Sequence, residues 1–333
     1  MPLLDTGYHH YDGRYRGVWY RRLVITAAGL RACLANPWMK RLVTMAWILS
    51  LAMVGILFFM GQLLVEDSFV FTFIESLNPA MRNLFGGLKT WLFDRPEESV
   101  HAAYNFLFFQ FATKISFLSF IAMTIAIPHL ITTDLASRAV LVYSSKAVNR
   151  FDYLIGKFGV AFGLMTILWL GPVVVAWIFG NLLAPDWHFF IHSRHALLNA
   201  VLYTTISMAI VSFVALGISA FSTKEKTTGA VWLAVWLLGN AFIPIGEKTQ
   251  LWLKNLSISF DIDQLALHFF KLRQDVEVAQ ESIPVLGNII DRLSRRTGEL
   301  FFMQEAGLGA ACIAMGLMLV ISALILWRKV KPE

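Results

Sequence analysis

The segment Leu42–Val65 reads LVTMAWILSLAMVGILFFMGQLLV and contains no acidic or basic residue. A helix needs about 20 predominantly apolar residues to cross the hydrocarbon core of a bilayer, so this segment is long enough to span a membrane. Further stretches of the same kind follow along the chain: Ala102–Pro128, Phe158–Leu183, Leu197–Phe221, Thr228–Gly246 and Ala306–Trp327. The sequence therefore predicts an all-α membrane protein with six transmembrane helices.

The composition of the whole chain agrees with this prediction. Of 333 residues, 57% are hydrophobic and 15% are charged, and the mean hydropathy is +0.62. Soluble domains contain about 25% charged residues, so disorder and a water-soluble enzyme are both disfavoured. Cys33 is expected on the cytoplasmic side and Cys312 near the outer end of the last span, too far apart for a disulfide.

The net charge of +6 is unevenly distributed between the loops. If the loops alternate between two sides, the side with both termini contains 16 Lys/Arg and 6 Asp/Glu, and the other contains 11 Lys/Arg and 16 Asp/Glu. The Lys/Arg-rich side is expected to be cytoplasmic, so the basic surplus indicates topology rather than affinity for nucleic acid. Because the first span begins only at Leu42, after a basic segment, no cleavable signal peptide is predicted.

Three regions are expected: a cytoplasmic N-terminal segment (1–41), the transmembrane domain (42–327) and a short cytoplasmic tail (328–333). Within residues 12–36, apolar residues recur at helical spacing beside several arginines. This pattern predicts an amphipathic helix on the inner leaflet, with docking on a partner protein as the alternative. Asn36-Pro37 is expected to separate it from the first span.

Two external segments, 66–101 and 247–305, contain further predicted helices. Residues 79–92 place their apolar side chains on one face, as expected of a helix on the outer leaflet. Residues 261–280 and 283–300 are predicted to form two helices separated by a proline. These two are interfacial or partly re-entrant, or they form a small external cap, and the sequence leaves the choice open.

The loop 129–157, between the second and third spans, has the most distinctive pattern. Thr133 is expected to cap a short helix that begins at Asp134, and Asn149 is expected to cap the helix that runs into the third span. The chain then shows these groups in order: Leu141-Val142, Ser144-Ser145, Asn149-Arg150, Phe151-Asp152-Tyr153 and Leu154-Ile155-Gly156-Lys157.

This pattern, with the six-span layout, resembles the permease subunit of type-2 ATP-binding-cassette (ABC) transporters, which are mainly exporters. Asp134 stands where relatives usually have Glu, and the segment 66–101 is longer than in compact relatives. The resemblance implies that the loop is a coupling helix that inserts into a cytoplasmic ATPase; without it, an ordinary polar loop would be the simpler interpretation. The residues expected at this contact are Asp134, Arg138, Ser145, Asn149, Arg150 and Asp152.

The chain lacks the motor that such a transporter needs. A phosphate-binding loop has the form Gly-x4-Gly-Lys-Ser/Thr, and the only Gly-Lys pair here, Gly156-Lys157, is followed by Phe158. The chain is therefore not expected to be an enzyme or to hold a cofactor, and ATP and Mg²⁺ are expected on a separate ATPase subunit. The resemblance implies two permease chains, identical or different, with two ATPases in a bacterial inner membrane.

The expected function is ATP-driven export of a hydrophobic or amphiphilic substrate. The alternative is a non-transporting membrane anchor or mechanotransmission subunit, whose external segments act on a periplasmic partner. No carboxylate occurs in any span, which favours an ATP-powered permease over a proton-coupled carrier.

Lys114 is the charged residue that the spans contain, and Gln110 lies one helical turn away. A charge at the bilayer centre costs about 2.5–3.5 kcal/mol on insertion scales, so it usually faces the protein interior or a wet cavity. With Asn240 of the fifth span, these residues form the predicted substrate cavity, in which Lys114 contacts an anionic substrate or lipid head group. The alternatives are a lysine paired with backbone carbonyls, or a deprotonated one.

Two weaker patterns complete the sequence-based predictions. His188, His192 and His195 have a spacing that places three imidazoles on one helix face, as zinc or copper sites require. The aromatic residues between them fit an interfacial belt equally well. Gly159-x3-Gly163 permits close helix approach, and is expected to serve packing within the chain rather than a dimer contact.

Overall fold

The computed structural model describes residues 17–63, 65, 70, 73–74, 76, 79–137, 149–297, 300–304 and 306–330. Among these residues there are helices and connecting segments but no β-strand. The predicted spans all correspond to helices that are long and apolar enough to cross a membrane: Pro37–Gln62, Pro96–Ala136, Arg150–Leu182, His188–Phe221, Glu225–Gly246 and Leu308–Lys329. The architecture is that of an all-α membrane protein.

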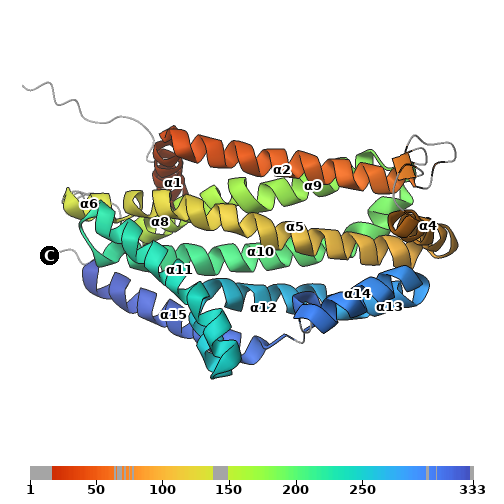
Figure 1. Cartoon of the computed structure of the whole chain (residues 1–333). Helices are drawn as coiled ribbons and strands as arrows, with labels where there is room; N and C mark the ends of the chain where they lie inside the picture. The colour runs from red at the N-terminus through yellow and green to blue at the C-terminus, as the bar shows by residue number, and fades with distance from the viewer. Residues whose placement is uncertain are drawn as a thin grey trace, which may run out of the picture.

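The helices form an elongated bundle (Figure 1). In chain order they are α1 (Val18–Ala35), α2 (Pro37–Gln62), α4 (Pro79–Asp94), α5 (Pro96–Ala126), η1 (Ile127–His129), α6 (Thr132–Ala136), α8 (Arg150–Met165), the π-helical turn η2 (Thr166–Leu170), α9 (Gly171–Leu182), α10 (His188–Phe221), α11 (Glu225–Lys248), η3 (Leu251–Leu256), α12 (Ile258–Phe270), α13 (Leu272–Ser282), α14 (Pro284–Thr297), η4 (Phe301–Met303) and α15 (Leu308–Lys329). Figure 1 places α6 and the last turns of α15 at one end, and α4, α13 and α14 at the other. We call these the α6 end and the α4 end.

Several spans begin before their apolar stretch, because their first turns are polar. α5 starts at Pro96 instead of Ala102 and has two glutamates in its first turn, where the helix dipole favours acidic residues. α2 starts at Pro37, and the Asn36 side chain accepts a hydrogen bond from the N–H of Trp38 at 2.9 Å. Asn36-Pro37 therefore separates the first two helices, as predicted.

Helix α1 runs at a steep angle to α2 and packs along α8 (Figure 1). α8 presents Gly156, Gly159 and Gly163 to it; a Cβ atom at Gly159 would lie only 2.5 Å from the hydroxyl of Thr26. The opposite face of α1 leaves large apolar side chains exposed: Trp19, Leu23 and Val24. A helix is present over the described part of residues 12–36, and the glycine pattern packs within the chain as predicted.

Helix α10 lies at the centre of the bundle, against α5, α8, α12 and α15. Small residues allow this close packing: a Cβ atom at Gly217 would lie 2.5 Å from Ser322 of α15. The fully buried indole of Trp169 has a satisfied N–H group, which donates to the carbonyl of Ala112 at 2.8 Å. Both cysteines are free thiols, as predicted.

The sequence left open whether the helices of segment 247–305 form an external cap, and the position of α12 answers this for its own residues. It packs inside the bundle against α5, α10, α11 and α15, and is therefore not part of an external cap. The first turn of α12 is capped by Ser257, whose hydroxyl accepts a hydrogen bond from the N–H of Phe260 at 3.2 Å. Near its end, Gln264 Oε1 accepts from the N–H of Gly307, just before α15, at 2.7 Å. The buried residues of α12 are Ile258, Asp261, Ile262, Gln264, Leu265, Ala266, Leu267 and Phe270.

The single helix predicted over residues 261–280 is wrong. Lys271 adopts a left-handed conformation with φ 48°, which ends α12 and starts α13. The break before Pro284 is present as predicted, and α14 follows it. α4 covers the predicted range 79–92, and together with α13 and α14 it forms a layer over the α4 end.

Candidate functional site

Helix α6 is joined to two spans by a group of buried hydroxyls. Ser219 of α10 accepts hydrogen bonds from the N–H groups of Ile131 (2.8 Å) and Thr132 (3.2 Å), and its hydroxyl donates to the carbonyl of Ile127 (2.7 Å). The Thr132 hydroxyl donates to the Ser219 carbonyl at 2.7 Å and lies 3.2 Å from the hydroxyl of Thr228 on α11. These bonds satisfy N–H groups that lack partners at the start of a helix.

The predicted start of α6 is therefore wrong. The helix begins at Thr132 instead of Asp134, and Ile131, not Thr133, precedes it without a side-chain cap. The cap comes from Ser219, which lies far away in the sequence. Local sequence patterns contain no signal for such a long-range cap.

Asp134 connects α6 to α8. Its Oδ2 atom accepts a hydrogen bond from the Tyr153 hydroxyl at 2.7 Å and lies 2.8 Å from Lys157 Nζ. The side chains of Lys157 and Asp134 are only 10% and 16% exposed, so either charge would be costly without its partner. Sequence reasoning selected Asp134 but missed Lys157; its position four residues after Tyr153, on the same helix face, was the available signal.

Two further charged residues of α8 bind neighbouring helices. Asp152 Oδ1 lies 2.6 Å from Nη2 and 2.8 Å from Nε of Arg22 on α1. Arg150 Nη2 donates to the carbonyls of Leu326 (2.6 Å) and Trp327 (2.7 Å) in the last turn of α15, and the guanidinium lies 4.9 Å from the centre of the Trp327 ring. A cation is favoured there because the last carbonyls of a helix lack partners within the helix.

Asp134 therefore lies on α6, and Arg150 and Asp152 lie in the first turn of α8. Each of the three bonds to another helix of this chain. Asn149 stands at the N-cap position of α8, as predicted, with an exposed side chain that makes no capping bond. Arg138 and Ser145 lie outside the described residues. We call the connected set the α6 junction: Arg22, Thr132, Asp134, Arg150, Asp152, Tyr153, Lys157, Ser219 and Thr228.

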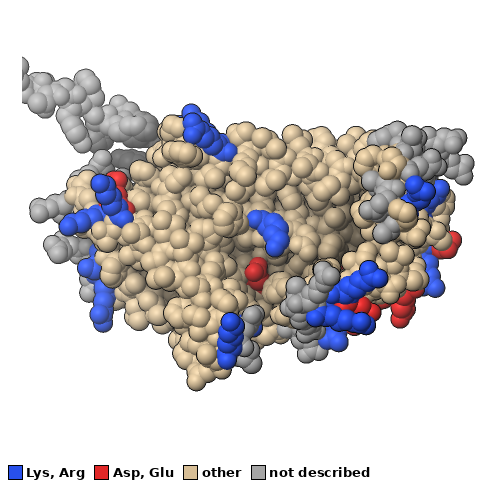
Figure 2. Space-filling model, in the orientation of Figure 1, with Lys and Arg blue, Asp and Glu red and all other residues tan. Residues whose placement is uncertain are grey.

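A second polar site lies on the flank of the bundle, between α5, α11 and α12. This pocket, of about 400 Å³, is lined by Lys114, Asn240 and Asp263 among others, and we call it the flank pocket. On the face drawn in Figure 2, charged side chains are sparse over the middle and gather toward the ends. Gln110, predicted to share this cavity, is not among its lining residues.

Aromatic rings and side-chain hydrogen bonds form the wall of the flank pocket between α11 and α12. Asn240 Oδ1 accepts from the hydroxyl of Ser257 at 2.6 Å, and the indole N–H of Trp236 donates to the hydroxyl of Ser259 at 3.0 Å. The ring centroids of Trp236 and Phe117 are 5.4 Å apart. The pocket therefore offers both an apolar aromatic surface and charged groups, as an amphiphilic ligand requires.

Helix α12 brings two carboxylates into the bundle. Asp263 lines the flank pocket with Lys114, and neither side chain forms a hydrogen bond or an ion pair with another described residue. Asp261 is fully buried, and neither of its carboxylate oxygens has a hydrogen-bond partner in the described part of the chain. The apolar stretches predicted as spans contain no carboxylate, but α12 brings two into the bundle, so their absence from those stretches is no argument against a proton-coupled carrier.

The histidines predicted as metal ligands do not form one site. His188 Nδ1 lies 2.8 Å from Asp186 Oδ1 on an exposed loop, and hydrogen bonds from the backbone and the ring of His188 hold the pKa of Asp186 below its usual value. His192 and His195 instead line a pocket of about 730 Å³ at the α4 end, where the ring centroids of His195 and His101 are 5.7 Å apart. Within the described ranges, no group of three or more His, Cys, Asp or Glu is placed to hold a metal ion.

No protein-family model matches this chain, and no curated protein matches it either. Its function must therefore be inferred from its own residues.

Proposed function

We propose that this chain is the permease subunit of a type-2 ABC transporter, driven by a separate ATPase subunit that binds ATP and Mg²⁺. In this proposal the α6 end faces the cytoplasm of a bacterial inner membrane, and both termini lie on that side. The loop charges support this orientation, because the side that contains α6 has 16 Lys/Arg and 6 Asp/Glu, whereas the other has 11 and 16.

The α6 junction is the observation that carries the proposal. A loop that only obeys the charge rule for topology has no need of buried bonds to several helices. Here α6 is bonded to α10 and α11 through Thr132, and to α8 through Asp134. α8 is bonded to α1 through Asp152 and to α15 through Arg150. A soluble motor that displaces α6 or the start of α8 therefore moves most of the bundle with it.

The flank pocket is the proposed contact for a hydrophobic or amphiphilic substrate. Lys114 would bind an anionic group of the substrate, Asp263 a cationic or hydrogen-bonding group, and the rings of Trp236 and Phe117 its apolar part. α11 and α15 leave large apolar side chains exposed, such as Leu238 and Ile313, which suits contact with lipid or with a second permease chain. The proposed assembly contains two permease chains and two ATPases.

A subunit that transmits motion to a periplasmic partner is the second candidate. It is favoured by the direct connection from α12, inside the bundle, through Lys271 to α13 and α14 at the α4 end. Movement of α12 would then change the surface that the α4 end presents. This candidate needs the same ATPase but no substrate flux.

The test is purification of the tagged chain from its native membranes in mild detergent, followed by reconstitution into liposomes. We expect an ATPase without membrane spans to co-purify and its hydrolysis to fall strongly in Asp134→Asn, which leaves Lys157 without its counter-charge. Asp291→Asn, on the exposed surface of α14, is the matched control and should retain activity. Absence of any ATPase partner would contradict the proposal, and hydrolysis without flux of a fluorescent lipid or of other amphiphiles would favour the second candidate.

A further inference from the structure

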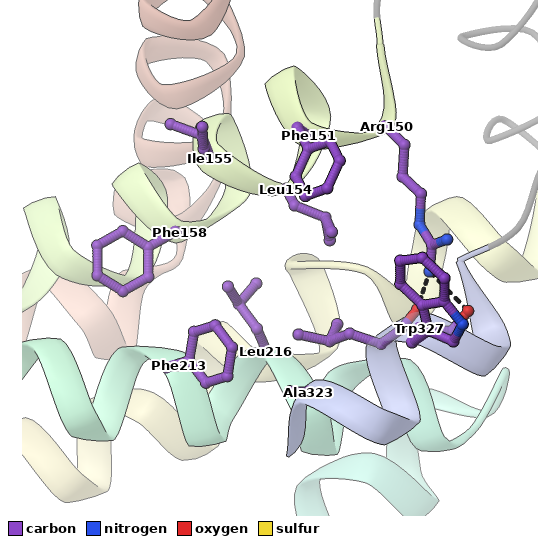
Figure 3. A pocket seen from close by; sticks show the side chains of 10 residues that line it. Arg150, Phe151, Leu154, Ile155, Phe158, Phe213, Leu216, Ala323 and Trp327 are labelled. Carbon is purple, nitrogen blue, oxygen red and sulfur yellow. Dashed lines mark hydrogen bonds between the residues drawn. The ribbon is translucent and has the colours of Figure 1, made fainter. Parts of the chain in front are cut away.

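An apolar pocket opens on the flank of the bundle between α8, α10 and α15, close to the α6 end. It has a volume of about 450 Å³, within the range of about 300–1,000 Å³ typical of small-molecule sites. Figure 3 shows side chains from all three helices around it, including Phe158, Phe213 and Leu216, with Arg150 and Trp327 at one side. We call it the α8–α15 pocket.

The lining of this pocket has one charge, and that charge is positive. Arg150 is the charged residue among its lining residues, and the others are apolar. Nη2 of Arg150 is occupied by the two carbonyls of α15, while Nε and Nη1 have no hydrogen-bond partner among the described residues. A guanidinium has five N–H donors, so several remain for a ligand. Arg328 and Lys329, both exposed, follow Trp327 directly and add positive charge nearby.

The pocket opens toward the surroundings of the bundle rather than toward its interior. Phe151 and Trp327, which line it, are 69% and 60% exposed. The lining helices α8, α10 and α15 all belong to the membrane-spanning set, so the medium outside the pocket is lipid. Arg150 is the first residue of α8 and Trp327 lies in the last turn of α15, which places the charge near the membrane surface.

We propose that the α8–α15 pocket binds an anionic phospholipid, with an acyl chain in the apolar interior and the phosphate on Arg150. Arginine binds phosphate through paired N–H donors, and basic pockets between transmembrane helices select anionic head groups. The site requires only that the chain spans a membrane, so it does not depend on an ATPase partner. A bound lipid adds a bridge between α8 and α15 beside the bonds that Arg150 already makes.

The site is tested on the purified full chain with brominated lipids, which quench nearby tryptophans. Trp327 reports on the pocket, and subtracting the signal of Trp327→Phe isolates it from the other tryptophans. We expect saturable quenching by brominated phosphatidylglycerol, with half-saturation at a concentration about fivefold lower than for brominated phosphatidylcholine. Equal quenching by the two lipids would show ordinary contact with bulk lipid and would overturn the proposal.

Three variants distinguish the effect of charge from the effect of pocket shape. Ala323→Phe fills the exposed mouth of the pocket without changing charge or adding a tryptophan, and should abolish the preference for phosphatidylglycerol while Trp327 stays in place. Arg150→Lys retains a positive charge and should retain part of the preference, whereas Arg150→Gln should lose it. Thermal melting of each variant identifies any that fail to fold. An unchanged preference in Ala323→Phe would overturn the proposal.

A displacement experiment distinguishes binding of a lipid from binding of a free anion. Inorganic phosphate and glycerol 3-phosphate contain the phosphate group but no acyl chain, so neither should displace the brominated lipid at matched ionic strength. Full displacement by either compound would show a simple anion site on Arg150, with no role for the apolar pocket, and would contradict the proposal.

Discussion

The α6 junction and the flank pocket use charge in opposite ways. In the α6 junction, Asp134 and Asp152 each have a basic partner within 2.8 Å. In the flank pocket, Lys114 and Asp263 line one pocket without forming a pair, and no hydrogen bond to another described residue satisfies either. Paired charges in a poorly hydrated place hold helices together, whereas unpaired ones are costly and persist where they bind something else.

The largest expected effect comes from breaking a pair in the α6 junction. Asp134→Ala leaves Lys157 nearly buried without a counter-charge and removes the acceptor for the Tyr153 hydroxyl. Loss of one partner of a buried pair costs about 3–5 kcal/mol of unfolding free energy. Thermal melting in detergent should show this loss as a lower midpoint and a smaller folded fraction.

A double variant distinguishes the lost charge balance from a simple loss of contacts. Asp134→Asn combined with Lys157→Met removes both charges, so most of the stability should return. If Asp134→Ala melts like the parent protein, the pair has no structural role and the comparison between the two sites is wrong.

A smaller effect is expected where α1 meets α8. Gly159→Leu places a side chain against Thr26, and overpacking of this kind costs about 1–3 kcal/mol. In a Cys312→Ser background, maleimide should label the buried Cys33 of α1 at least about fivefold faster once that contact opens. Gly55→Leu on α2 is the matched control, because no atom lies within 4 Å of its added Cβ.

The rate at which maleimide labels Cys33 also depends on pH. Burial raises the pKa of Cys33, so little reactive thiolate exists near neutral pH in the parent protein. Labelling should therefore rise with pH in both proteins, but the rise should begin at lower pH in Gly159→Leu, where the thiol is hydrated. Identical pH profiles would mean that α1 stays docked.

Removing the unpaired charges should not destabilise the protein. Lys114→Met and Asp263→Asn should each leave the unfolding free energy unchanged or raise it, because neither side chain forms a hydrogen bond or ion pair with a described residue and an unpaired charge in this setting is itself costly. The substrate-stimulated part of ATP hydrolysis in liposomes should fall about tenfold, as expected for one charged contact. A strong loss of stability would show that the two side chains pair with each other after all.

The smallest effect is expected from metal removal. Because His188 is bound to Asp186 and the described residues contain no suitable ligand group, EDTA or added zinc should leave the melting midpoint unchanged. Triple replacement of His188, His192 and His195 by Gln should not alter this result. A zinc-dependent rise in the midpoint that these replacements abolish would revive the metal site.

The spans were predictable because hydrophobicity acts locally and over many residues. Asn36-Pro37 and the break before Pro284 were also predictable, since both are properties of short sequence patterns. Asp134, Arg150 and Asp152 were selected through a family resemblance, and the structure shows what each one contacts.

What the sequence did not reveal depends on distant contacts. The partners Arg22 and Ser219 lie far from α6 and α8 along the chain, and no periodicity marks them. Asp263 was assigned to an external segment because α12 is too short and too polar to be recognised as part of the bundle. Lys271 ends α12 in a left-handed conformation, which is uncommon for a residue other than glycine and which no pattern in the sequence indicates.

The position of α12 has a consequence for the order in which the chain assembles in the membrane. Asp261, Asp263 and Gln264 make this helix too polar to enter lipid by itself, and it packs against α15, which is synthesised later. The surface of α12 that faces α15 therefore stays uncovered until Leu308–Lys329 has been synthesised and inserted. Helix α15 thus completes the packing around a helix that precedes it in the chain.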